Sequence, residues 1–271
     1  LYNLSDDQTE YQINDRMSFM RFLGINLCEK VPDAKTIWKF KNDLAETETV
    51  DKLFCMFDEH LENKGLISHK GTIVDATFVD APRQRNSRDE NKKIKNGVIP
   101  EGWEKPENKS KLAQKDIDAD WTKKNGERHF EYKDHVKCDA DSKLITNYSV
   151  TSASVHDSQR CLVFIGQEDE VLYADSAYSG KPIALALPEN CKNQICEKGY
   201  RNSPLTSEQK MNNRRKSRIR CRIEQIFGFM TGAMHGITIR SIGITRAWMN
   251  IGITNLVYNF CRYSYLKGAS A

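Results

Sequence analysis

This 271-residue chain lacks the cysteine pairs of a structural zinc site and the long apolar runs of a membrane protein. Its eight cysteines are scattered, and no two of them form the C-x-x-C pair of a structural zinc site. No apolar run is long enough to cross a membrane. A chain of this size needs no disulfide framework, so we expect a soluble, globular protein of a reducing compartment, the cytoplasm, without a membrane partner.

Strong net charge is also missing, but the charge that is present is unevenly distributed. The net charge is +4, yet the segment from Lys198 to Arg222 holds nine basic residues and one acid, Glu208. Such a block is typical of proteins that bind a phosphate-rich partner. A solvated helix face is an equally good interpretation at this point.

The order of predicted elements indicates an α/β fold. Residues 1–64 show helical spacing, with Ser5 and Asp33 as N-cap candidates. The elements that follow are a strand at 71–81, a lysine-rich excursion at about 82–126, a hairpin of two strands within 129–154, a short helix at 157–167, an apolar strand at 170–175, a brief helix from 181, a possible short strand at 193–198, and helices from about 207 to 265. An antiparallel meander followed by alternating strands and helices is the RNase H-like order.

The order alone does not decide the fold, but it is compatible with an RNase H-like, retroviral integrase-like mixed sheet flanked by helices, behind an N-terminal helical region, which is the fold that we predict. The expected boundaries are 1–68 for the helical region and 69–265 for the second domain, with a lysine-rich insertion at about 82–126. A loop of that length inside a domain is usually functional or disordered. Because the chain begins at Leu1 without Met, we expect it to be a fragment or a processed product.

Three acids stand out by their positions. Asp75 lies in the middle of the first predicted strand, Asp175 ends the apolar strand "VLYAD", and Glu224 lies on a late basic helix with Arg220 one turn before it. At ~100° per residue Glu224 flanks an apolar stripe, which consists of Ile219, Ile223, Ile226, Phe227 and Met230. If that helix packs across the sheet, Glu224 can approach both aspartates.

Converging carboxylates need cations, because like charges a few Å apart repel strongly at low dielectric. Oxygen ligands suit Mg²⁺, and two such ions can activate an attacking oxygen and stabilise a leaving oxygen at phosphorus. Each acid also has an ordinary interpretation. Asp75 could be a polar residue at a strand edge, Asp175 a turn former, and Glu224 the ion-pair partner of Arg220.

The motif sequences resemble those of the DDE transposases of bacterial insertion sequences, specifically the insertion sequence 5 family within the insertion sequence 4 group. "GTIVDATFVDAP" is similar to the first aspartate motif, "VLYADSAYSG" to the second, and "RIRCRIEQIFGFM" to the glutamate motif. The segments "LSDDQTEYQINDRMSFMRFLG" and "VPDAKTIWKFKNDL" are similar to the helical region that precedes the catalytic domain. The resemblance therefore covers nearly the whole chain.

The resemblance implies a metal-dependent enzyme that cleaves DNA at transposon ends and transfers the strand into target DNA. Asp75, Asp175 and Glu224 would be catalytic and would bind two Mg²⁺ or Mn²⁺ ions. The partners would be double-stranded DNA with terminal inverted repeats and target DNA, bound by a homodimer in the bacterial cytoplasm, in association with the nucleoid. A domesticated or inactive derivative that binds DNA without cutting it is the alternative, and a nuclease that never joins strands is a third possibility.

The expected DNA-binding residues are basic side chains of the late helix together with two residues of the second strand. They are Lys133, His135, Arg215, Lys216, Arg218, Arg220 and Arg222. For His135 a structural role is the competing interpretation. The sequence departs from the family's glutamate motif at Ser217 and Thr231, where the wider group has Tyr and Lys. The family's first helical segment is also expected to be missing before Leu1.

Overall fold

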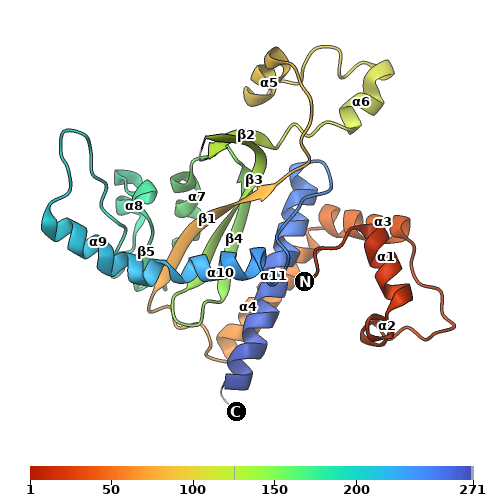
Figure 1. The fold of residues 1–271 in the computed structure, drawn as a ribbon. Coiled ribbons are helices and arrows are strands. Elements are labelled where there is room, and N and C mark those ends of the chain that lie inside the picture. The colour runs from red at the N-terminus through yellow and green to blue at the C-terminus, as the bar shows by residue number, and fades with distance from the viewer. Residues whose placement is uncertain (125, 270–271) are drawn as a thin grey trace.

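The computed structural model describes residues 1–124 and 126–269. Its centre is a six-stranded mixed sheet with helices packed against it (Figure 1). The strands are β1 (Thr72–Asp80), β2 (Asp120–Lys124), β3 (Glu127–Asp139), β4 (Ile145–Ser152), β5 (Val171–Tyr173) and β6 (Lys192–Asn193). The fold is therefore mixed α/β.

The helices precede, interrupt and follow the sheet in the chain. They are α1 (Asp6–Asp15), α2 (Met17–Leu23), α3 (Ala34–Glu46), α4 (Thr49–Asn63), α5 (Arg88–Lys95), α6 (Lys109–Ala113), α7 (Asp157–Phe164), α8 (Lys181–Ala186), α9 (Ser207–Arg220), α10 (Arg222–Thr231) and α11 (Ile244–Ala269), with 3-10 turns at Pro106–Asn108 and Ser176–Tyr178. Among the helices of the described residues, none combines the length and apolarity that a membrane crossing requires.

The strands follow the order β2-β3-β1-β5-β6, and β4 also pairs with β3. The β1–β3 and β3–β4 pairs are antiparallel, whereas β5 pairs parallel with both β1 and β6. The pairing with β5 continues beyond β6, because the amide of Cys196 donates to the carbonyl of Ala174. The hairpin, the central strand and the short strand after α8 are thus confirmed.

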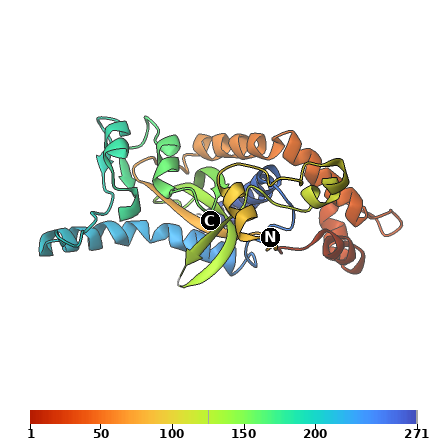
Figure 2. The ribbon, with the colours of Figure 1, turned by 90° about the horizontal axis from the view of Figure 1, so that it is seen from above.

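Alternation along β1 divides the core into two layers. Ile73 and Val79 pack with buried residues of α10 and α11, whereas Val74 packs with residues of α7, α8 and β5. Figure 2 shows α10 on one side of the sheet and α7 and α8 on the other. Asp75 shares its side of β1 with Ile73, so its side chain faces the layer that contains α10.

The predicted late basic helix is two helices. α9 ends at Arg220 and α10 begins at Arg222, with Cys221 between them at φ −60° and ψ −8°. The apolar stripe is confirmed, since Ile223, Ile226 and Met230 are fully buried. No glycine or proline marks this break, so sequence patterning could not have located it.

The excursion at about 82–126 is more ordered than predicted. It contains α5, α6 and the edge strand β2, which pairs with the start of β3. Trp103 is 1% exposed, and its Nε1 donates to Glu90 Oε1 over 3.0 Å. This buried indole anchors the segment to α5.

The N-terminal helices form where their caps predict them. Ser5 caps α1 in a capping box, and Asp33 caps α3 through the amide of Thr36. α3 and α4 both pack against α11, the last helix of the chain. The boundary at residue 68 stays a prediction.

Candidate functional site

Asp75 is held in a fixed orientation near the middle of β1. Its Oδ1 accepts the backbone N–H of Ala76 at 2.9 Å, and its Oδ2 accepts Nη1 of Arg220 at 2.7 Å. The side chain is 19% exposed. A carboxylate in this half-buried position requires a positive partner.

Glu224 shares that positive partner. It lies in the first turn of α10, and its Oε1 accepts Nη2 of Arg220 at 2.8 Å. The two carboxylates therefore bind different nitrogens of one guanidinium, although Arg220 lies 145 residues beyond Asp75 in the sequence. The ion pair between Glu224 and Arg220, one of the interpretations of the sequence, is present.

Asp175 enters the same region from the neighbouring strand. It follows β5, which pairs with β1, and it caps the 3-10 turn at Ser176–Tyr178 by accepting the N–H of Ala177 on Oδ1 at 2.6 Å. The turn-forming role foreseen for Asp175 is thus confirmed. The same hydrogen bond fixes the orientation of the carboxylate, so the turn-forming role is compatible with the predicted metal-binding role.

The electrostatics show that the negative groups converge. Burial raises the pKa of Asp75 to about 6, with smaller raising effects from the charges of Asp175 and Asp157. The bond from Ala76 and the charge of Arg220 act in the opposite direction. Burial lowers the pKa of Arg220, but the charges of Asp75, Glu224 and Asp175 outweigh it and raise that pKa above its ordinary value. Two of the three acids thus contact one cationic group, and the charge of the third acts on it.

This donor set is suited to a hard divalent cation. All the donors are carboxylate oxygens, the ligands that Mg²⁺ prefers. In the described ranges, however, the triads whose donor atoms all lie within 4.8 Å of one another are two other groups. The structure brings Asp75 and Glu224 onto Arg220, and within the described residues the three predicted acids do not form one such tight cluster.

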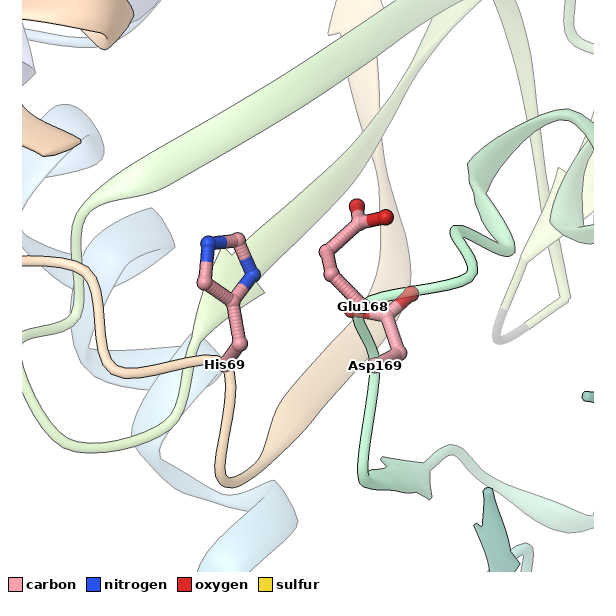
Figure 3. Close-up of side chains that lie close together, drawn as sticks. All are labelled: His69, Glu168 and Asp169. Atoms are coloured by element: carbon pink, nitrogen blue, oxygen red, sulfur yellow. The ribbon is translucent and has the colours of Figure 1, made fainter. Parts of the chain in front are cut away.

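The first of those other groups consists of His69, Glu168 and Asp169 (Figure 3). A lysine already neutralises it, because Nζ of Lys137 lies 2.9 Å from Asp169 Oδ2 and 3.6 Å from Glu168 Oε1. A metal ion there would have to compete with a buried ammonium. Sequence reasoning missed this network, because its members are distant in the chain and follow no motif.

Asp80, His129 and Glu131 form the second group. They lie on neighbouring strands, since Asp80 pairs with Glu131 in the β1–β3 register. His129 Nδ1 is 3.4 Å from Glu131 Oε1. This group lies on the face of β1 opposite to Asp75, so it is separate from the predicted site.

Comparison with known proteins settles the family. The family model described as "Transposase DDE domain" matches residues 67–260, and one described as "Transposase domain (DUF772)" matches residues 1–43. The chain belongs to the transposase DDE-domain family. Among solved structures, a cryo-EM structure of the piggyBac transposase synaptic complex with hairpin DNA is similar, with 11% identity and a TM-score of 0.44. The match covers 98% of this chain and 63% of that chain, so this chain spans less than two thirds of its length.

Of the basic residues predicted to bind DNA in this transposase-family chain, some make contacts within the protein and others are exposed. Besides Arg220, Lys216 donates to the carbonyl of Ile195 at 2.9 Å, and Arg222 donates to the carbonyl of Ala140 and to Asp141. Arg215 and Arg218 are exposed on α9. The predicted DNA-binding set is therefore not uniform, because three of its members hold parts of the fold together.

Lys133 and His135 point to the face of the sheet opposite to Asp75. Lys133 Nζ donates to the carbonyl of Val155 and to Asp157 Oδ1, both at 2.8 Å. His135 is fully buried, with Nε2 2.8 Å from Thr151 Oγ1. Burial lowers the pKa of His135 to about 4, so the imidazole is neutral at pH 7. This environment favours the structural role over the predicted contact with DNA.

Proposed function

We propose that this protein is a DNA transposase in which Asp75, Asp175 and Glu224 hold two Mg²⁺ or Mn²⁺ ions. The observation that carries the proposal is the binding of Asp75 and Glu224 to one guanidinium, on which the charge of Asp175 also acts. Membership in the transposase DDE-domain family supports it. The motifs further support assignment to the insertion sequence 5 family within the insertion sequence 4 group, with action in the bacterial cytoplasm, at the nucleoid.

The strand arrangement supports the RNase H-like part of the proposal. The antiparallel strands β3 and β4 lie on one side of β1, and the parallel strands β5 and β6 lie on the other. Asp75 on the central strand and Asp175 just after its parallel neighbour then project from adjacent strands. The helix that carries Glu224 packs over the side of the sheet that Asp75 faces.

The proposed reaction takes place at phosphorus in two steps. In the first, a water oxygen bonds to the phosphorus at the transposon end and the 3′ oxygen leaves as a hydroxyl. In the second, that hydroxyl attacks a target phosphodiester, with one P–O bond formed and one broken. When bound, the metal ions would activate the attacking oxygen and stabilise the leaving oxygen. The backbone amides of Ala76 and Ala177 orient the two aspartates for this role.

Exposed basic residues of α9 would hold the DNA backbone, so binding would depend strongly on salt. Because two transposon ends must be joined, we propose a homodimer on DNA with terminal inverted repeats and target DNA. The alternative is a domesticated or inactive derivative that binds DNA without cutting it. The ion pair of Glu224 with Arg220 is the observation in its favour.

The test is a cleavage and joining assay with labelled terminal-repeat DNA and a target plasmid, in Mg²⁺, Mn²⁺ or EDTA. The proposal expects nicked ends and joined product with either metal, and neither of them in EDTA. Cleavage without joined product would indicate a nuclease. DNA binding without cleavage under every condition would establish the DNA-binding alternative.

A further inference from the structure

One side of α9 is fixed to the body of the protein by polar contacts. Asn213 exchanges hydrogen bonds with the backbone of Glu197, at 2.9 and 3.0 Å. Lys216 donates to the carbonyl of Ile195, and Gln209 donates to the carboxylate of Glu197. These contacts set the rotation of α9 about its axis, so the direction of every other side chain on it is determined.

The adjoining side of α9 borders an open groove of about 590 Å³. Lys210, Arg214 and Arg218 line it at intervals of four residues, which places them on one side of the helix at steps of about 6 Å. All three are exposed, and in the described part of the chain their charged groups make no hydrogen bond or ion pair. The groove is thus a line of three cations that the protein itself does not neutralise.

The groove also leads toward the candidate metal site. Cys221 lines its end, and this residue connects α9 to α10, whose first turn carries Glu224. Figure 1 shows the two helices following one another along the sheet, with the first half of α9 reaching past α8. A strand lying along Lys210, Arg214 and Arg218 would therefore run toward the start of α10, whose first turn carries Glu224.

We propose that this groove binds the phosphodiester backbone of duplex DNA and guides one strand to the candidate metal site. Of the three cations, Lys210 and Arg214 lie outside the set that the motifs indicated. Regularly spaced negative charge is the chemistry that a line of unpaired cations matches, since each DNA strand carries one charge per ~3.4 Å of axis. The inference rests on the proposed function for the identity of its ligand. It adds which side of α9 makes the contact.

The test measures binding of the full chain to a fluorescein-labelled duplex of random sequence, in EDTA, by fluorescence anisotropy. Random sequence suffices because phosphate contacts carry no sequence information. Binding is measured at several salt concentrations between about 50 and 200 mM, where the slope of log K against log salt counts phosphate contacts. The main variant is Lys210→Ala with Arg214→Ala.

Two comparisons isolate the groove from charge in general. Lys35→Ala with Lys39→Ala removes two exposed lysines, also four residues apart, from α3. Arg215→Ala removes an exposed charge from α9 itself, about 100° around the helix from Arg214. Because all these side chains are exposed, the melting temperatures of the variants should match that of the wild type, which circular dichroism checks.

If the groove binds DNA, the slope of log K against log salt should be smaller by about 2 for the Lys210/Arg214 variant than for the wild type, at close to 0.9 per lost contact. The Lys35/Lys39 variant should keep the wild-type slope, and Arg214→Ala should reduce it more than Arg215→Ala. An unchanged slope for the Lys210/Arg214 variant would overturn the inference, as would equal losses for Arg214→Ala and Arg215→Ala. A wild-type chain that does not bind the duplex would overturn the proposed function as well, and the two failures are thereby distinguished.

Discussion

Asp134 shows how burial alone changes the chemistry of one residue. It is fully buried, and burial raises its pKa to about 8 against the lowering effect of the bond from Asn255. Asp134 Oδ1 accepts Nδ2 of Asn255 at 3.2 Å, while Asp134 Oδ2 and Asn255 Oδ1 are buried and have no hydrogen-bond partner among the described residues. A proton on the carboxyl group removes the charge from this apolar layer, so the neutral acid is the stable form at pH 7.

We predict that Asp134→Asn changes how stability depends on pH. The folded pKa, about 8, lies above the ordinary value of 3.8. The stability that the proton supplies is therefore complete below the unfolded pKa and is lost as the pH rises through the folded pKa. The melting temperature of the variant should gain on that of the wild type between pH 5 and pH 8. A difference that stays constant over this range would show that Asp134 does not titrate in this way.

Lys137 and Asp169 form a buried ion pair with a measurable role in stability. The Lys137 and Asp169 side chains are 8% and 2% exposed, and Asp169 also accepts the hydroxyl of Thr72 at 2.6 Å. Lys137→Met would leave a buried carboxylate uncompensated, so urea denaturation should show a loss of about 3–5 kcal/mol. The control is Lys92→Met, on the exposed side of α5, which should change stability by less than about 0.5 kcal/mol. Equal effects of the two substitutions would contradict the network.

At the scale of elements, the sequence predicted those helices and strands whose determinants lie within a few residues of one another. The β-branched run of β1 and the capping residues Ser5 and Asp33 each determine structure within a few residues, and the structure confirms them. β2 was missed because an edge strand needs no apolar alternation and its residues are mostly polar. The break at Cys221 was missed because no glycine or proline marks it in the sequence.

The packing of α10 against the sheet leads to a prediction for the element that carries Glu224. Ile226 is fully buried in the cluster that includes Ile73 and Val136. Ile226→Ala should destabilise the protein by about 2–5 kcal/mol, because it leaves a cavity under the helix. Phe229, on the same helix, is 37% exposed, so Phe229→Ala should cost clearly less in the same urea titration. Similar losses would mean that α10 is not anchored through Ile226.

At the scale of the molecule, the sequence indicated which residues belong to the site but not how they meet. Motif resemblance selected Asp75, Asp175 and Glu224, and in the structure Asp75 and Glu224 both bind Arg220. The opposite orientation of Lys133 and His135 follows from the β1–β3 register, which pairs Asp75 with Val136. A register is a property of two strands packed together, so no reading of one strand could supply it.

The central claim is that Glu224 belongs to a metal-binding site and is more than an ion-pair partner of Arg220. The most direct measurement compares Mg²⁺-dependent cleavage of terminal-repeat DNA by the wild type, Glu224→Gln and Glu208→Gln, with DNA binding measured in parallel. Glu208 is an exposed acid in the first turn of α9, so its substitution is the matched control. The account predicts that Glu224→Gln abolishes cleavage but binds DNA, while Glu208→Gln retains both. Cleavage by Glu224→Gln at the wild-type rate would contradict it.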